Sequence, residues 1–242
     1  MSHIEAGGSA NALETVAARA RHAVRSRFDG PGGYYNAGNL LGLVTAVTTE
    51  LVVALTSQTG SAGDLVYAYF LGSPSALALS IATVIFLVSG ETYHRAWAGR
   101  TVPDGRLNRV ADLLSVAGAT ALTASLMFIG QVPLALASGA LIIGGKLGSA
   151  ITCDDRTRLE FWPKYWVDPF RGAVLAGRLP GLAAAALDLV RHGLDNPNGL
   201  AMFSLAPQAV LVVCYVLWIR ADLLLIGGAR SVANGHAKAV LS

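Results

Sequence analysis

Five stretches of mostly apolar residues, each long enough to cross a lipid bilayer, divide this chain of 242 residues. A helix that spans the hydrocarbon core of a bilayer needs about 20 such residues in a row. The sequence therefore predicts an all-α polytopic transmembrane helix bundle. The five stretches are Ala37–Ser57, Pro74–Tyr93, Asn108–Gly130, Val132–Thr152 and Gly199–Ile219, the last of them interrupted by Pro207.

The composition excludes most alternatives to a membrane protein. Charged residues make up only 14% of the chain, whereas about a quarter of the residues in a soluble domain are charged. This balance excludes a water-soluble monomer, and it also excludes a disordered chain, which would be polar and highly charged. A formal net charge of +3 is too small to indicate a nucleic-acid partner. The predicted partner is the lipid bilayer.

The distribution of Lys and Arg predicts the orientation, because short loops rich in these residues stay in the cytoplasm. Segments 58–73 and 130–132 contain neither residue, and the segments that alternate with them are basic. This pattern predicts a cytoplasmic N-terminus. The abundance of Arg, Ala and Gly is typical of a bacterial chain, so we expect the bacterial inner membrane. The basic residues are Arg19, Arg21, Arg25 and Arg27 before the first span, Arg95, Arg100 and Arg106 after the second, and Arg156, Arg158, Lys164, Arg171 and Arg178 after the fourth.

A sixth segment, Gly172–Val190, leaves the number of spans open at five or six. It contains Arg178, Pro180 and Asp188, and its clean apolar part, Leu179–Leu187, is too short to span. If the basic residues after the last span are also cytoplasmic, the number of crossings is even, which favours six. The segment then crosses the membrane or enters it as a re-entrant loop. Those basic residues are Arg220, Arg230 and Lys238.

Two further segments are predicted to lie at the membrane surface. Residues Asn11–Phe28 carry apolar side chains at helical spacing with arginines beside them, which is typical of an amphipathic helix in the headgroup layer. A solvated or partner-binding helix is the alternative, and we expect the turn Asp29–Gly33 to end it. The second segment holds aromatic and basic residues that anchor proteins at the interface, with a ligand-binding cluster as the alternative. These anchors are Trp162, Lys164, Tyr165 and Trp166.

The residues after these anchors predict two short helices. Asp168 followed by Pro169 is typical of a helix N-terminus. We expect a first helix from Pro169 to about Arg178 along the cytoplasmic face. Pro180 is expected to break it and to start a second helix that ends near Gly193.

The chain therefore divides into four parts. These are a cytoplasmic N-terminal segment (1–36), a four-span core (37–152), an interfacial segment with a re-entrant loop or fifth span (153–193), and the last span with its tail (194–242). Within the core, similar residues recur between the two predicted hairpins, at one offset for the first and third spans and at another for the second and fourth, as in parallel-repeat transporters. Matches of Ala, Gly, Leu and Ser also arise by chance in apolar segments, so the repeat stays open.

Ionisable residues inside the predicted spans are the candidate functional residues, because such groups are unfavourable in lipid and usually face the bundle interior. Glu91, Asp112 and Lys146 fall at one depth in the cytoplasmic third, which predicts a buried ion-paired cluster. A purely structural role in helix packing is the alternative.

Glu50 lies deeper in the bilayer than these residues. It is roughly 19 Å along the helix axis from Ala37, with no cation predicted at its depth. It must therefore meet a partner, meet water or be neutral. We interpret it as a proton or cation site, with hydrogen-bonded packing as the alternative.

No catalytic motif is present, which argues against an enzyme, and no cofactor is indicated. Two distant cysteines, Cys153 and Cys214, support neither a disulfide scaffold nor a metal site. A GxxxG motif, Gly144 to Gly148, permits close helix contact within the chain or in a homo-oligomer. Two function classes remain. The first is a transporter or channel for a small solute or ion, with Glu50 and the charged cluster on its pathway. The second is a non-catalytic membrane subunit or scaffold of a larger complex.

Overall fold

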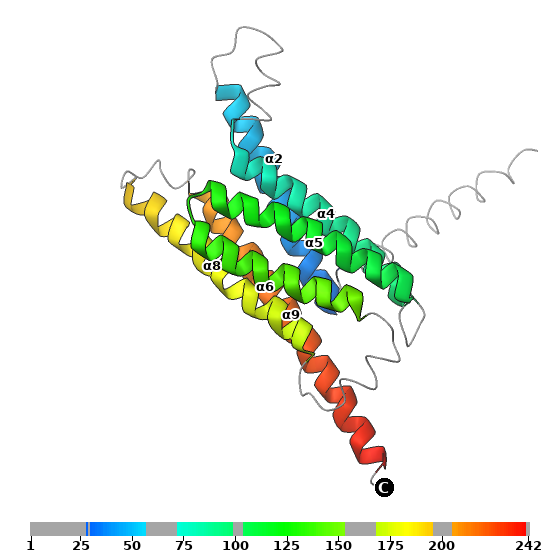
Figure 1. The fold of residues 1–242 in the computed structure, drawn as a ribbon. Coiled ribbons are helices and arrows are strands. Elements are labelled where there is room, and N and C mark those ends of the chain that lie inside the picture. The colour runs from blue at the N-terminus through cyan, green and yellow to red at the C-terminus, as the bar shows by residue number, and fades with distance from the viewer. Residues whose placement is uncertain are drawn as a thin grey trace, which may run out of the picture.

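A computed structural model shows how the predicted spans are arranged (Figure 1). It describes the backbone of residues 28, 30–56, 72–98, 104–152, 168–195 and 205–240, and their side chains except at 30, 31, 56, 195 and 228–240. The predicted amphipathic helix at Asn11–Phe28 and the predicted anchors Trp162, Lys164, Tyr165 and Trp166 therefore fall outside the described residues, apart from Phe28.

The predicted fold class is confirmed. Within the described ranges the chain forms six helices that are long and apolar enough to cross a membrane, and it forms no strand. The helices are α2 (Gly30–Thr56), α4 (Pro74–Trp97), α5 (Gly105–Phe128), α6 (Val132–Ile151), α8 (Pro169–Asp195) and α9 (Ala206–Val240).

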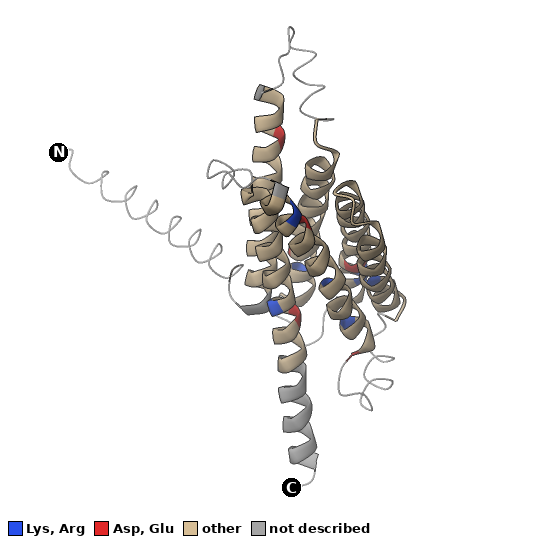
Figure 2. Cartoon of the chain, turned by 90° about the vertical axis from the view of Figure 1, so that its left-hand side faces the viewer, with Lys and Arg blue, Asp and Glu red and all other residues tan. Residues whose placement is uncertain are grey.

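The six helices form a closed ring. Each helix packs against the one before it and the one after it, and α9 packs against α2 to complete the ring (Figure 1). Charged residues are sparse along these helices, as Figure 2 shows. We call the end of the bundle at which α2, α5 and α8 begin the basic end, because the arginine-rich segments of the sequence flank it.

The doubtful sixth segment is a regular membrane-length helix, and the expectation of two short helices is wrong. Helix α8 runs without a break from Pro169 to Asp195 and contains Pro180. A proline is tolerated inside a membrane helix when neighbouring helices satisfy the backbone group that it frees. The predicted start is correct, because the Asp168 carboxylate accepts a hydrogen bond of 2.9 Å from the backbone N–H of Phe170.

The ends of the first and last spans also differ from the prediction. Helix α2 already begins at Gly30, so residues 30–33 of the expected turn are helical, at a position where a proline is favourable because its φ suits the start of a helix. Pro207 does not interrupt the last span, because α9 begins at Ala206. The membrane-length part of α9 extends to Gly227, beyond the predicted end at Ile219.

Aromatic side chains from α9 and α4 fill the interior of the ring. Trp218 is 1% exposed, and its ring makes edge contacts with Phe86 of α4 and Tyr215 of α9. Glycines make room for these rings, since a Cβ at Gly38 would lie 2.7 Å from the Trp218 indole and a Cβ at Gly181 would lie 2.4 Å from the Tyr215 ring. The interior is therefore densely packed beside the polar residues described next.

The two glycines of the predicted GxxxG motif lie in different surroundings. A Cβ at Gly148 would lie 2.2 Å from the Phe170 ring of α8, so this glycine serves packing within the chain. A Cβ at Gly144 would meet nothing within 4 Å among the described residues. The two glycines therefore do not form one shared contact face.

Candidate functional site

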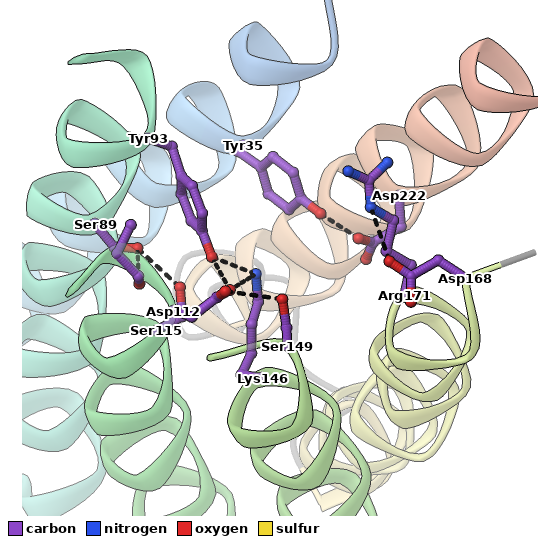
Figure 3. A network of polar contacts seen from close by, with 11 residues as sticks. Tyr35, Ser89, Tyr93, Asp112, Ser115, Lys146, Ser149, Asp168, Arg171 and Asp222 are labelled. Atoms are coloured by element: carbon purple, nitrogen blue, oxygen red, sulfur yellow. Dashed lines mark hydrogen bonds and ion pairs between the residues drawn. The ribbon is translucent and has the colours of Figure 1, made fainter. Parts of the chain in front are cut away.

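Two groups of buried and partly buried polar side chains lie at the basic end of the bundle (Figure 3). Each consists of an aspartate, a tyrosine and a cation that come from three different helices. We call them the Asp112 triad (Tyr93, Asp112 and Lys146) and the Asp222 triad (Tyr35, Asp222 and Arg178).

The Asp112 triad joins α4, α5 and α6. The Tyr93 hydroxyl donates a hydrogen bond to Asp112 Oδ1, and Lys146 Nζ lies 3.5 Å from the same oxygen. Lys146 Nζ also donates to the Tyr93 hydroxyl at 2.9 Å, and Ser149 donates to Asp112 Oδ2 at 2.8 Å. Asp112 is 2% exposed and both of its oxygens accept hydrogen bonds. Of the predicted cluster, Asp112 and Lys146 do form an ion pair, in which Asp112 is buried and the Lys146 side chain is 23% exposed.

The Asp222 triad joins α2, α8 and α9. The Tyr35 hydroxyl donates to Asp222 Oδ1, and Arg178 Nε lies 3.5 Å from Asp222 Oδ2. Both charged residues are 5% exposed. The guanidinium carbon of Arg178 also lies 5.0 Å from the centre of the Trp218 ring, at a distance that allows a cation–π interaction.

The two triads lie side by side and form one polar layer. Figure 3 shows Tyr35 and Tyr93 next to one another, with Asp112 and Lys146 below Tyr93 and Asp222 beyond Tyr35. The charges of Asp222 and Arg178 also act on Lys146, which belongs to the other triad. Two serines extend the layer, because the Ser89 hydroxyl lies 2.8 Å from that of Ser115 and also donates to the Ala111 carbonyl. With two carboxylates and two cations, the layer is formally neutral.

The contacts within the layer replace the hydration that its two buried carboxylates lose. A buried carboxylate is stable only when a cation and hydrogen-bond donors replace its hydration. Each aspartate here receives one cation and one tyrosine hydroxyl, and Asp112 receives a serine as well. The tyrosine and carboxylate oxygens of the layer are groups that can exchange protons.

We compared the chain with protein-family models, with curated proteins and with solved structures. None of these comparisons finds a match. A proposal for the function therefore depends on the geometry of the layer.

Glu91, which the sequence analysis groups with Asp112 and Lys146, forms its ion pair elsewhere. Its Oε1 lies 3.0 Å from Nε of Arg95, one turn later on α4, and its side chain is 31% exposed. Equal depth along the helix axis places Glu91 near the polar layer. It does not decide which face of α4 carries the side chain.

Glu50 lies near the other end of α2, away from the polar layer, and is 2% exposed. Its carboxylate lies near the backbone of Leu77, in the first turn of α4. Neither oxygen completes a hydrogen bond with a described residue. The positive end of the α4 dipole favours a carboxylate at this position, which gives Glu50 a local electrostatic partner.

The sequence patterns do not indicate Tyr35, Tyr93 and Asp222 as site residues, and they give Arg178 a part only in the orientation and in the doubt about the sixth span. Asp222 is missed because the predicted end of the last span, Ile219, leaves it outside the membrane. One signal was available, since Arg178 and Asp222 are opposite charges in two consecutive apolar segments near the same end.

The described residues offer no obvious metal site. No group of three or more His, Cys, Asp or Glu side chains gathers among them. The lysine and arginine of the triads occupy the places beside the carboxylates that a metal ion would need.

Proposed function

We propose that this chain is a small multi-pass transporter or channel for a small solute or ion, and that the polar layer at the basic end is its ion-handling site. The observation that carries the proposal is the pair of neighbouring aspartate triads buried inside one helical ring. Ionisable groups are unfavourable inside a membrane protein, and where they occur together they usually mark substrate pathways or proton relays.

The chemistry of the layer supports this role. The cation and the hydroxyl beside each aspartate are held by other helices, so a shift of one helix changes the partners of the carboxylate. The two triads lie within electrostatic range of one another, so we expect a change of charge in one triad to act on the other. Coupled changes of this kind are what a transporter needs in order to link ion binding to helix movement.

A scaffold or subunit role is the second candidate, and the dense interior favours it. Trp218, Tyr215 and Phe86 fill the ring next to the polar layer. In this alternative the triads only fix helix packing, and the chain serves as a rigid component of a larger membrane complex.

Ion flux into liposomes separates the two candidates. The full chain is reconstituted, and proton, sodium and potassium fluxes are measured under imposed gradients. We expect wild-type flux for at least one ion and an at least tenfold loss in both Asp112→Asn and Asp222→Asn, because neither variant keeps the ionised carboxylate.

The control variant is Asp104→Asn, which makes the same chemical change at the N-cap of α5. Asn and Asp cap helices about equally well, and Asp104 lies outside the triads, so its flux should equal that of the wild type. Undiminished flux in both triad variants contradicts the proposal. Absence of any flux from folded wild-type protein, together with stoichiometric co-purification of other membrane proteins, supports the scaffold role instead.

We further propose a bacterial inner-membrane location with the basic end in the cytoplasm. The support is the alternation of arginine-rich and basic-free segments along the chain. The described helices begin and end in agreement with that alternation.

A further inference from the structure

The three side chains of the Asp112 triad form a continuous line of hydrogen bonds (Figure 3). The Lys146 ammonium donates to the Tyr93 hydroxyl at 2.9 Å, and that hydroxyl donates to Asp112 Oδ1. The direct distance from Lys146 Nζ to Asp112 Oδ1 is 3.5 Å, which is longer than the roughly 2.7–3.2 Å of most N–H···O bonds. The better hydrogen-bonded route between the cation and the carboxylate therefore passes through Tyr93.

The two ends of this line differ in exposure. The Asp112 side chain is 2% exposed, whereas the Lys146 side chain is 23% exposed. Lys146 lies roughly one and a half turns before the end of α6 at Ile151. Long lysine side chains near the end of a membrane helix extend toward water. The line thus connects a buried carboxylate to a partly exposed amine at the basic end.

The Asp222 triad has the same components but a different kind of cation. A guanidinium stays protonated in proteins, whereas a lysine can lose its proton when it is buried. Arg178 is therefore a fixed charge beside Asp222, and it also lies against the Trp218 ring. Lys146 can release a proton and take one up again. Of the two triads, only the Asp112 triad has a cation that can take part in proton transfer.

Charges of both signs surround Lys146. Two carboxylates attract its ammonium, and two arginines of α8 repel it, so Lys146 is not held in its protonated form by attraction alone. These four residues are Asp112, Asp222, Arg178 and Arg171. Further ionisable groups on the helices of the layer are Tyr35 of α2, which lies within electrostatic range of Tyr93, Glu91 with its partner Arg95 and the exposed His94 on α4, and Arg109 of α5, which donates to the Ala150 carbonyl.

We propose that the ion handled by the Asp112 triad is the proton, and that Tyr93 relays it between Lys146 and Asp112. This names the ion of the transporter proposed above, and as a statement about cargo it rests on that function. A proton needs neither a cavity nor a shell of ligands, which fits an interior where Trp218 and Tyr215 are buried against one another. A metal cation would have to displace the Lys146 ammonium from Asp112.

The relay step moves two protons along the line. The Tyr93 O–H bond breaks as its proton forms an O–H bond with Asp112 Oδ1, and one Lys146 N–H bond breaks as that proton forms the new Tyr93 O–H bond. Lys146, now a neutral amine, takes a proton from a hydronium ion at the basic end, which becomes water. The triad has then gained one proton, and its charge has risen from zero to +1. The reverse steps release the proton.

Infrared difference spectroscopy on the full chain in liposomes tests where the proton binds, without any measurement of transport. A change from neutral to acidic pH should produce the carbonyl stretch of a protonated carboxyl group. Part of this band should be absent in Asp112→Asn. The control is Asp104→Asn, the same chemical change at the N-cap of α5, which should keep that part. Identical bands in Asp112→Asn and the wild type would overturn Asp112 as the proton-binding site.

The rate at which the Asp112 band appears after a pH jump tests the relay. Tyr93→Phe removes the hydroxyl between Lys146 and Asp112 and keeps both charges. It should slow the appearance of the band about tenfold, since a positioned proton-transfer group typically accelerates transfer by at least that much. Tyr34→Phe is the matched control, because it makes the same change at an exposed tyrosine of α2, and it should keep the wild-type rate.

Proton flux into liposomes under a pH gradient provides the second readout. We expect an about tenfold loss in Tyr93→Phe and none in Tyr34→Phe. Lys146→Arg keeps the positive charge beside Asp112 but cannot release a proton, so it should abolish the flux. Melting temperatures show that each variant is folded, and Lys146→Arg tests the relay even if Tyr93→Phe does not fold.

The outcomes separate this proposal from the proposed function. Wild-type rates and proton flux in folded Tyr93→Phe or Lys146→Arg would overturn the relay and leave the triad a packing role. Flux of sodium or potassium without proton flux would keep the transporter but contradict the proton as its ion. An Asp112 band that appears slowly in Tyr93→Phe, in a protein without any flux, would contradict the transporter and support the relay.

Discussion

Asp112, Asp222 and Glu50 are buried carboxylates that are balanced by different side chains or helix ends. Asp112 is neutralised by Lys146 and by hydroxyl donors, Asp222 by Arg178 and Tyr35, and Glu50 lies near the first turn of α4. The sequence alone predicts the Asp112–Lys146 pair because depth can be counted along a helix. It does not predict that Glu91 pairs with Arg95, because depth says nothing about which face of the helix a residue occupies.

The Asp112–Lys146 pair should show strong energetic coupling. Lys146→Met leaves Asp112 charged and buried, and we expect it to lower the free energy of unfolding by about 3 kcal/mol. Adding Asp112→Asn removes the stranded charge and should recover at least about 1 kcal/mol of that loss. Denaturant titration of all four proteins in detergent measures this cycle.

The same cycle with Glu91 is the control. Glu91→Gln combined with Lys146→Met should give additive losses, because Glu91 pairs with Arg95. Additive losses for Asp112 as well would mean that Lys146 and Asp112 are not coupled in the folded protein.

Glu50 tests whether the far end of the bundle takes part in transport. Glu50→Gln keeps the shape of the side chain and part of its hydrogen-bonding capacity, so the variant should remain folded. If Glu50 is a proton or cation site, this variant should abolish cation- or pH-dependent uptake into proteoliposomes. Wild-type uptake by the folded variant would leave Glu50 only a packing role beside α4.

The helices show where apolar patterning is reliable and where it is not. The predicted spans at α4, α5 and α6 differ from the observed helices by only a few residues. Helix α8 was doubtful because Arg178, Pro180 and Asp188 were counted as if each faced lipid. Arg178 and Asp188 are in fact buried, Arg178 in an ion pair with Asp222 and Asp188 with the His192 ring 3.3 Å away. A hydropathy value describes one residue alone and takes no account of a partner elsewhere in the chain.

The close contact between α8 and α9 depends on Gly181. Gly181→Ala places a methyl group 2.4 Å from the Tyr215 ring. The overpacking should destabilise the protein by about 1–3 kcal/mol. Gly144→Ala is the matched control, because its Cβ meets no described atom within 4 Å and alanine favours the helix by up to about 1 kcal/mol.

Melting temperatures of both variants in detergent measure the difference. A melting temperature for Gly181→Ala equal to or above that of the wild type would show that α8 and α9 can separate without loss. That result would remove the glycine contact as a determinant of the ring.

At the scale of the whole molecule, apolar segments and basic loops predict the fold class but not the ring. The closure between α2 and α9 depends on contacts such as the Trp218–Asn39 hydrogen bond, which joins residues 179 positions apart. No periodicity within either helix indicates such a contact. For the same reason, the sequence does not predict that Asp222 is the ion-pair partner of Arg178.

The orientation of the whole bundle is testable by cysteine labelling in intact cells. Cys153 is replaced by Ser, whereas Cys214 is fully buried and can stay. With the basic end in the cytoplasm, Ser61→Cys should react with a membrane-impermeant maleimide and Gly105→Cys should not. Labelling of Gly105→Cys without labelling of Ser61→Cys would mean the inverted topology.

The closure of the ring by α2 and α9 has a consequence for biosynthesis. Tyr35 emerges from the ribosome long before Asp222, its partner 187 residues later. Arg178 likewise enters the bilayer before the carboxylate that balances it has been made. The nascent chain must therefore keep these polar groups near water or near the insertion machinery until α9 arrives. Assembly of this membrane domain is therefore completed late in translation, and a chain that stops before α9 leaves Arg178 without its carboxylate.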